Sequence, residues 1–192
     1  MPQLVLASTS KYRKGLLDRL GIPFDMVSPG VDETPQADET PTDLALRLAR
    51  QKALAVAEDH PESVIIGSDQ VASFDGKSLS KPLTRDKALA QLKMLSGKSV
   101  EFHSALCVYT ASAGKAQVEL ETTIVHFKTL TEQEILSYIE KEPSFDCVGA
   151  FKSESLGICL CERIENNDPT ALVGLPLIRL SRMLKQAGID IL

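Results

Sequence analysis

The feature that most constrains the fold is a pair of long segments in which apolar and polar residues alternate, at positions 100–111 and 116–127. Only a short turn at Gly114-Lys115 separates them, so we expect two adjacent antiparallel strands. Short apolar runs elsewhere alternate with helix patterns, beginning with a strand at residues 4–7 and a helix that Gly21 closes. Because hairpins join antiparallel strands and crossover helices join parallel ones, the sequence predicts an α/β fold with a mixed central sheet flanked by helices.

Caps, apolar runs and turn residues define the remaining expected elements. Thr131 and Glu134, for example, have the spacing of a capping box at a helix start. The expected helices run from residue 40 to about 60, from 84 to about 96, from 131 over a short stretch, and from 176 to about 187. The other expected strands are at residues 24–28, 64–71, 148–151 and 158–161.

Length and composition set the scale of the protein. The 192 residues, 43% of them hydrophobic, are enough for one compact domain over residues 1–192, whose core can be shared between two lobes. There are 21 basic and 26 acidic residues, a net charge of −5, and no long basic stripe, so we expect no nucleic-acid partner. The sequence shows neither an apolar run of membrane-spanning length nor a signal-peptide pattern, which predicts a cytoplasmic protein with no membrane partner.

The four cysteines form no CxxC pair, and the three histidines are scattered. Cys159 and Cys161 are two residues apart in an apolar segment that we expect to be a strand, so their side chains would share a face. A metal-binding pair is one interpretation of this spacing, but buried thiols are much more common. We therefore expect a reduced protein in which these cysteines hold no metal.

Hydroxyl residues at positions 8–10 connect the first expected strand to the first helix. At such a turn the free backbone N–H groups and the positive helix end can hold an anion, and phosphate is the commonest one. Ordinary helix capping by Ser or Thr explains the same residues. Arg13 lies in the first helical turn, where its charge opposes the helix dipole, a small cost that a bound phosphate would offset.

Two acidic residues lie where a metal-dependent phosphate enzyme would need them. Glu33 lies in the loop after the second expected strand, where a solvated loop acid is the simpler explanation. Asp69 lies on a strand whose first half is entirely apolar. A carboxylate in that position must face a cleft, pair with a base or bind a cation.

Two lysines are candidates to accompany these acids. Lys81 follows an expected hairpin turn at Asp75-Gly76, where a two-residue turn would place it opposite Gln70 and a three-residue loop opposite Val71. Either register leaves its ammonium group within reach of the strand acid. Lys52 lies on an Ala-rich helix, where its context alone suggests a solvated lysine.

Considered together, these charged residues suit phosphoryl chemistry. Bases bind phosphate oxygens, carboxylates hold Mg²⁺, and one carboxylate can orient or deprotonate a water. The sequence contains neither a P-loop nor a GxGxxG motif, and no Ser or Cys nucleophile lies beside a convincing His, which disfavours kinase, ATPase, dinucleotide and acyl-transfer functions. The set is Arg13, Lys52, Lys81, Glu33 and Asp69.

Five motifs resemble those of the Maf nucleotide pyrophosphatases, in the family's order and over nearly the whole chain. They are Ala7-Ser8-Thr9-Ser10-Lys11-Tyr12-Arg13, Val31-Asp32-Glu33, Gly67-Ser68-Asp69-Gln70, Lys81-Pro82 and Val173-Gly174-Leu175-Pro176-Leu177. The resemblance implies a two-lobed, Maf/ITPase-like fold with a substrate cleft, hydrolysis of a nucleoside triphosphate to the monophosphate and pyrophosphate, and a divalent cation, Mg²⁺ or Mn²⁺. It is also compatible with a homodimer. It implies that Asp69 is the general base and a metal ligand, that Glu33 is a metal ligand, and that the triphosphate contacts are Ser8, Arg13, Lys52 and Lys81.

A finer resemblance concerns the base of the nucleotide. The family branch that acts on dTTP and UTP usually has Arg, Thr and Gln at the positions of Tyr12, Gln70 and Glu154, whereas residues 146–157 and 168–172 are similar to the branch that hydrolyses 7-methyl-GTP. A carboxylate can accept two hydrogen bonds from the N1–H and 2-amino groups of guanine, which uracil and thymine lack. A cationic N7-methylated ring favours a nearby acid and an aromatic face. We therefore expect Glu154 to read the base edge, Gln70 to assist and Tyr12 to pack against the ring.

The sequence thus predicts a metal-dependent pyrophosphatase for a small, modified purine nucleotide. A dTTP/UTP or broad-specificity pyrophosphatase could use the same machinery. A protein of another class, a non-catalytic nucleotide-binding regulator of cell division, would need binding alone. The combination of carboxylates and lysines favours catalysis, because binding does not require a group that activates water.

Overall fold

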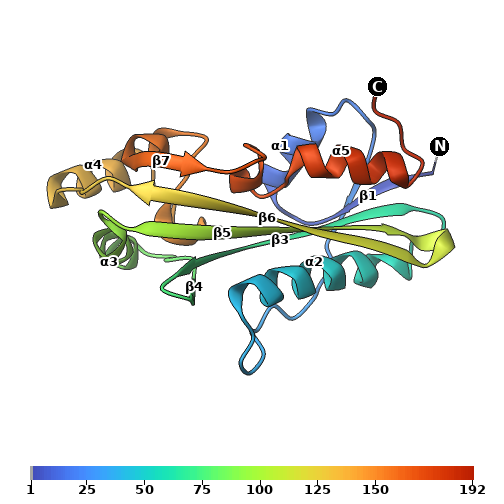
Figure 1. The fold of residues 1–192 in the computed structure, drawn as a ribbon, viewed down its shortest axis with the longest axis horizontal. Coiled ribbons are helices and arrows are strands. Elements are labelled where there is room, and N and C mark those ends of the chain that lie inside the picture. The colour runs from blue at the N-terminus through green and yellow to red at the C-terminus, as the bar shows by residue number, and fades with distance from the viewer. Residues whose placement is uncertain (1) are drawn as a thin grey trace.

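The protein is built around a seven-stranded mixed sheet, seen in a computed structural model that describes residues 2–192 (Figure 1). The strands are β1 (Leu4–Ala7), β2 (Asp25–Val27), β3 (Val64–Phe74), β4 (Lys77–Leu79), β5 (Ser99–Thr110), β6 (Lys115–Phe127) and β7 (Cys161–Glu165). Their order is β2-β1-β3-β5-β6-β7, and β4 pairs with β3. β1 is parallel to β2 and β3, whereas β3, β5, β6 and β7 are successively antiparallel. The predicted mixed sheet, with the long hairpin β5–β6, is confirmed.

Helices cover both faces of this sheet. They are α1 (Lys11–Asp18), α2 (Pro41–Ala57), α3 (Arg85–Leu95), α4 (Glu132–Lys141) and α5 (Leu177–Gln186). α1 and α5 lie on one face near the chain termini, α2 lies on the other face, and α3 and α4 lie at the far end of the molecule (Figure 1). The helices α1 to α4 each follow a Ser or Thr whose side-chain oxygen accepts a hydrogen bond from the backbone N–H three residues on, as the cap signals predict. None of the helices within residues 2–192 has the length and apolar character needed to cross a membrane.

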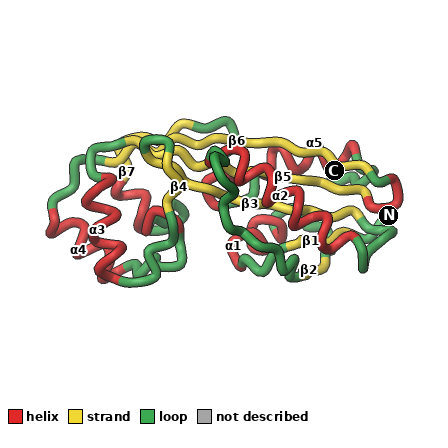
Figure 2. Tube along the Cα trace, turned by 90° about the horizontal axis from the view of Figure 1, so that it is seen from below, coloured by secondary structure: helices red, strands yellow, loops and turns green. Residues whose placement is uncertain are grey.

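The long strands β3, β5 and β6 connect two lobes (Figure 2). The first lobe has a core on each face of the sheet, with Leu17 of α1 on one face and Leu48 of α2 on the other. The second lobe has a separate core, in which Leu92 of α3 packs with Phe102 at the start of β5. One pocket is lined by Leu48 of the first lobe and Phe102 of the second, which confirms the expected two-lobed fold with a cleft.

The strands expected at residues 148–151 and 158–161 are wrong. Both segments instead contain 3₁₀ turns, and the last strand begins only at Cys161. Gly149 and Ala150 have φ angles of 76° and 53°, in the left-handed region, which extended strand backbone does not occupy. The apolar residues of these segments pack against the second core without joining the sheet.

This change of structure also separates the two neighbouring cysteines. Cys161 is buried, as expected, but Cys159 lies in a 3₁₀ turn and is exposed. Their side chains therefore do not share a strand face. Within residues 2–192 there is no cluster of three or more His, Cys, Asp or Glu side chains that could hold a metal ion by themselves.

The hairpin between β3 and β4 uses the shorter of the two turns considered above. Phe74 pairs directly with Lys77, so the loop consists only of Asp75-Gly76. These two residues have φ angles of 49° and 74°, as a type I′ turn requires. β4 ends at Leu79, so Lys81 leaves the sheet and lines the pocket between the lobes.

Gly67 marks the point at which α2 crosses β3 in direct backbone contact. A Cβ atom at this position would overlap the carbonyl oxygen of Ala49 and lie 2.7 Å from the backbone nitrogen of Ala53. Replacing Gly67 by alanine is expected to destabilise the protein by about 2–3 kcal/mol, because two rigid backbones must separate. Urea unfolding measures this loss.

A glycine on the exposed surface of α1 provides the matched control. A Cβ atom on Gly15 would meet nothing within 4 Å, so Gly15→Ala should stabilise the helix by up to about 1 kcal/mol. Equal unfolding midpoints for the two alanine variants would argue against the close approach at Gly67. The approach matters for the site, because Lys52 lies between Ala49 and Ala53 on α2 and forms an ion pair with Asp69 of β3.

Candidate active site

A gap in the strand pairing forms the pocket. β1 ends at Ala7, opposite Gly67 of β3, and β4 pairs with β3 only from Ala72 onward. Between these points, residues 68–71 of β3 face no other strand of the described chain along this edge. A pocket of about 1040 Å³ opens there, bordered by the start of α1, by α2 and by the end of β4.

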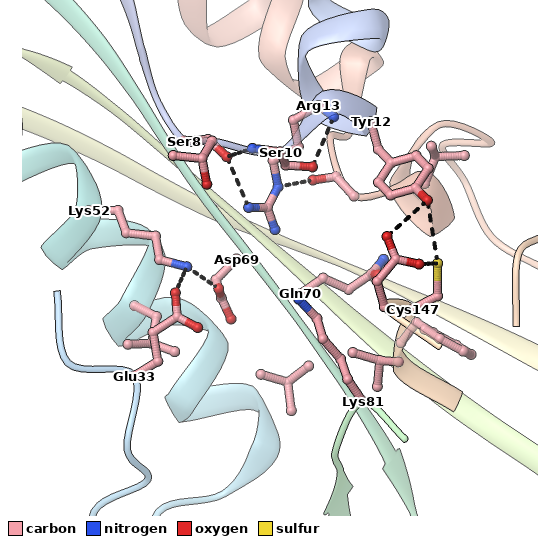
Figure 3. A pocket seen from close by; sticks show the side chains of 18 of the residues that line it. Ser8, Ser10, Tyr12, Arg13, Glu33, Lys52, Asp69, Gln70, Lys81 and Cys147 are labelled. Carbon is pink, nitrogen blue, oxygen red and sulfur yellow. Dashed lines mark hydrogen bonds and ion pairs between the residues drawn. The ribbon is translucent and has the colours of Figure 1, made fainter. Parts of the chain in front are cut away.

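All nine residues that the sequence analysis assigned to a site line this one pocket. Figure 3 labels all of them except Glu154. They come from six separate segments, so only the fold brings them together. They are Ser8, Tyr12, Arg13, Glu33, Lys52, Asp69, Gln70, Lys81 and Glu154. Their individual roles stay predictions.

Lys52 lies between the two acidic residues of the set. Its Nζ atom is 2.6 Å from Oδ1 of Asp69 and 2.6 Å from Oε1 of Glu33 (Figure 3). The side chains of Lys52 and Asp69 are only 6% and 10% exposed, whereas that of Glu33 is 61% exposed. Lys52 is therefore buried and ion-paired, in contrast to the solvated lysine that its helical context alone suggests.

The charges of the pocket keep Glu33 ionised. Partial burial would by itself raise the pKa of this carboxyl group. The hydrogen bond and charge of Lys52, with the charges of Lys81 and Arg13, outweigh this effect, so the pKa of Glu33 lies below its ordinary value. Lys81 thus acts on Glu33 at a distance, and within residues 2–192 it forms no direct ion pair with Asp69. Several cations around two carboxylates make a pocket suited to a polyanion that arrives with a metal ion.

The turn between β1 and α1 combines helix capping with a directed arginine. Ser10 is the N-cap, and its Oγ accepts a hydrogen bond from the backbone N–H of Arg13 at 3.3 Å. Ser8 is buried, and its Oγ accepts hydrogen bonds from the backbone N–H of Ser10 at 3.1 Å and from the Arg13 guanidinium at 3.5 Å. Arg13 Nε donates to the carbonyl of Gly174 at 3.0 Å, which fixes the guanidinium in the pocket wall. Burial lowers the pKa of Arg13 and the pocket acids oppose that shift, so the arginine stays charged.

Tyr12 follows this turn and has two partners that the sequence analysis missed. Its hydroxyl lies 3.4 Å from Oδ2 of Asp146 and 3.8 Å from Sγ of Cys147 (Figure 3). Burial, aided by Cys147 and nearby acids, raises the pKa of Tyr12, so the phenol keeps its proton. The ammonium groups of Lys11 and Lys152 lie 5.1 Å and 5.7 Å from the ring centroid, so the ring already attracts cations. The only sequence signal for Asp146 and Cys147 was their place at the start of the segment that resembles the 7-methyl-GTP branch.

Gln70 and Glu154 line the pocket in different ways. Gln70 Nε2 lies within 3.0 Å of three oxygens, Ser104 Oγ and the carbonyls of Ala171 and Leu172, so its N–H groups hold the loop before α5. Only its carbonyl oxygen is left for a ligand, because no hydrogen bond to that atom forms among the described residues. Glu154 is exposed in the turn before Ser155 and forms no ion pair within residues 2–192, so its carboxylate is available to a ligand.

Asp168 shapes the pocket wall from outside. It is buried, its Oδ1 accepts hydrogen bonds from the backbone and side chain of Thr170, and its Oδ2 accepts one from the backbone N–H of Ile178 at 2.7 Å. Ile178 lies in the first turn of α5, so this carboxylate caps that helix and fixes the loop that carries Gly174. Asp168 therefore supports the pocket wall without lining the pocket.

Asp69 and Glu33 fit a divalent cation that takes most of its ligands from elsewhere. Mg²⁺ is usually bound by one or two carboxylates together with waters and substrate phosphates. In the described chain Lys52 binds one oxygen of each carboxylate, and Asp69 Oδ2 and Glu33 Oε2 accept no hydrogen bond from protein groups. These oxygens are the two protein ligands that such an ion would use.

The similarity of this chain to known proteins extends over nearly its whole length. A family model described as Maf-like protein matches residues 3–187. The chain belongs to the Maf family. The resemblance drawn from the five motifs is thereby confirmed, and all five lie within the matched residues of this Maf protein.

Curated relatives of this Maf chain have a common name. A Burkholderia lata protein named 7-methyl-GTP pyrophosphatase is 57% identical over 189 residues, which are 97% of this chain and 90% of that protein. A Methylobacillus flagellatus protein of the same name is 50% identical over 192 residues, which cover both chains completely. The solved structure of the Staphylococcus aureus Ham1 protein is 13% identical, covers 66% of this chain and 72% of that chain, and has a TM-score of 0.43, a likeness too weak to carry an argument.

Proposed function

We propose that this Maf protein is a nucleoside triphosphate pyrophosphatase that hydrolyses 7-methyl-GTP to 7-methyl-GMP and pyrophosphate. The observation that carries the proposal is the meeting of Asp69, Lys52 and Glu33 in one pocket, beside the cations that a triphosphate needs and the residues that a methylated guanine needs. The common name of its relatives at 50–57% identity supports the same activity.

The triphosphate lies along the edge of β3 left open between β1 and β4. Ser8 and Arg13, at the positive start of α1, hold one part of the chain of phosphates. Lys81, beyond β4, neutralises the remaining phosphate groups. The ammonium group of Lys52 contacts the carboxylates in the free protein and the phosphate oxygens when the nucleotide is bound. The charge that develops on the leaving pyrophosphate in the transition state is stabilised by these cations.

Asp69 is the general base of the reaction. It accepts a proton from a water whose oxygen forms a bond to the α-phosphorus, while the bond from that phosphorus to the bridging oxygen of the pyrophosphate breaks. When bound by Glu33 and Asp69, Mg²⁺ or Mn²⁺ would neutralise phosphate charge and lower the pKa of a bound water.

The base lies between the two lobes, where the remaining candidates select it. Tyr12 packs against the cationic ring, and the hydrogen bonds that its hydroxyl donates to Asp146 and accepts from Cys147 fix the plane of its own ring. Glu154 accepts hydrogen bonds from the N1–H and 2-amino groups, and the Gln70 carbonyl oxygen assists. A pyrimidine offers neither the donor pair nor the positive charge.

Residues 1–192 act as a single pyrophosphatase domain in the cytoplasm, with Mg²⁺ or Mn²⁺ as the cofactor and a small nucleotide as the substrate. The direct test is a panel of nucleoside triphosphates with and without N7 methylation, scored for pyrophosphate release with each metal. The highest kcat/KM is expected for 7-methyl-GTP, and a higher value for dTTP or UTP would overturn the assignment.

Glu154→Gln should change the order of substrates without affecting folding. Loss of the paired acceptor is expected to lower kcat/KM for 7-methyl-GTP by about 10–100-fold, since a bidentate contact to a base edge contributes about 1–3 kcal/mol of discrimination. The value for UTP should change little. Glu58→Gln, an equivalent change at an exposed residue outside the pocket, is the control. An unchanged substrate order in the Glu154 variant would remove this residue from base recognition.

A further inference from the structure

Arg47 of α2 attaches the loop that carries Glu33 to this helix at two further points, Thr34 and Glu39. Arg47 Nε lies 2.6 Å from Oε1 of Glu39, and one of its terminal nitrogens lies 2.8 Å from Oε2, which is a two-pronged ion pair. The same terminal nitrogen donates to the backbone carbonyl of Thr34 at 3.1 Å, one residue after Glu33. The other terminal nitrogen donates to Gln51 at 2.9 Å on the next turn of α2. Each of the three guanidinium nitrogens thus donates at least one hydrogen bond.

The rest of the loop depends on the same contacts. Asp32 Oδ1 accepts hydrogen bonds from the backbone and side chain of Thr34, at 2.9 Å and 2.7 Å. Glu39 Oε2 also accepts a hydrogen bond from the backbone N–H of Gln36 at 2.9 Å. Residues 32–38 are exposed and contain no helix or strand, so polar contacts replace the packing that would fix this segment.

The Arg47–Glu39 pair and Glu33 differ in the solvent exposure of their side chains. The side chains of Arg47 and Glu39 are only 18% and 7% exposed, although both lie near the surface. Glu33, whose carboxylate must reach Lys52, is 61% exposed. Its hydrogen bond to Lys52 would cost conformational entropy if the loop were free, and Arg47 removes much of that cost in advance. Because Arg47 and Lys52 lie on the same helix, the contact sets Glu33 in a fixed position relative to Lys52.

We propose that Arg47, through its pair with Glu39, is a positioning residue that holds Glu33 in the pocket; this rests on the role of Glu33 in the proposed function. Arg47 does not line the pocket and touches no reacting atom. The hydrogen bonds from Arg47 lower the pKa of Glu39 to about 2, so the pair is charged at any pH at which the enzyme would be assayed. Its effect on the reaction passes through Glu33 alone.

A double-mutant cycle tests whether Arg47 acts on the reaction through Glu33. Arg47→Ala is expected to lower kcat by about 10–100-fold and to raise the Mg²⁺ concentration needed for half-maximal rate, as loss of a supporting contact around a metal ligand usually does. In a Glu33→Gln background the same change should alter kcat by less than about twofold, because the group it positions is already lost. Arg47→Lys keeps the positive charge but loses the planar guanidinium that binds both oxygens of Glu39. Its kcat should therefore lie between those of wild type and Arg47→Ala.

Arg50→Ala is the matched control, because Arg50 lies on the same helix, is exposed and forms no ion pair within residues 2–192. It should leave both kcat and the Mg²⁺ dependence unchanged. If Arg47 only stabilised α2, Arg47→Ala would lower the melting temperature and kcat equally in both backgrounds. Such additivity would overturn the proposal.

Amide hydrogen exchange supplies a measurement that does not depend on turnover. In Arg47→Ala, the hydrogen-bonded amides of this loop, those of Thr34, Gln36 and Glu39, should exchange at least about tenfold faster than in wild type, while the core of α2 keeps its protection. Unchanged exchange in this loop would overturn the positioning role whatever the kinetics. If wild type hydrolyses no nucleotide, the proposed function fails, and the exchange measurement still decides whether Arg47 holds the loop.

Discussion

Asp69→Asn is expected to abolish pyrophosphate release while the protein still binds its nucleotide. The amide cannot accept a proton from water, and removal of a general base costs about 10³-fold in kcat. Its shape is unchanged, and Lys52 keeps its ion pair with Glu33, so the pocket should stay intact. Steady-state pyrophosphate release gives kcat, and calorimetric titration with 7-methyl-GTP gives the dissociation constant. A loss of about 10³-fold in kcat with a dissociation constant within about tenfold of wild type is the expected result.

The same variant separates an enzyme from a nucleotide-binding regulator. A regulator of cell division that needs only binding should function equally well when this acid is replaced by its amide, since the ligand is retained. An enzyme should lose its cellular effect together with turnover. Asp25→Asn, at an exposed residue of β2 outside the pocket, controls for the charge change. Wild-type kcat in the Asp69→Asn variant would exclude this residue as the base.

Most of the fold could be predicted because its signals are local. The caps at Ser10, Thr40, Thr84 and Thr131 begin helices where expected, and the Asp75-Gly76 turn sets its hairpin. The segment 148–160 could not be predicted in the same way. Its apolar residues resemble buried strands, but the left-handed conformation at Ala150 is imposed by packing against the second lobe, which no local pattern reports.

In the site, the types of the functional residues could be predicted from the sequence, but their contact partners could not. The acids and bases could be selected from the sequence because their chemistry suits phosphate and metal, and the pocket contains every one of them. Their partners depend on distant segments. Arg13 binds the carbonyl of Gly174, and Tyr12 meets Asp146, contacts across more than a hundred residues that only the folded chain creates. Lys52 is the clearest case, because its helix context indicates a solvated lysine, and the glycine at position 67 brings it into the buried ion pair.

Lys52→Met should have the second large effect, on stability as well as on rate. Removing one partner of a buried ion pair leaves an uncompensated charge and costs about 3–5 kcal/mol, and here the stranded charge is the 10%-exposed carboxylate of Asp69. Glu33 can turn to solvent, so it adds little to the loss. Urea unfolding at neutral pH measures the effect. Because Lys52 also contacts phosphate in the proposed mechanism, kcat/KM should fall by about 10²–10³-fold.

A second substitution distinguishes the electrostatic cause from a packing defect. In Lys52→Met combined with Asp69→Asn the stranded charge is gone, so at least about 1–2 kcal/mol of the lost stability should return. Activity should not return, because both groups needed for turnover are missing. A packing defect from methionine would persist in the double variant, and its unfolding midpoint would then be no higher than that of Lys52→Met. Recovery of stability without recovery of activity would mean that the ion pair between α2 and β3 exists because the reaction needs both charges, and that a neutral pair would serve the fold as well.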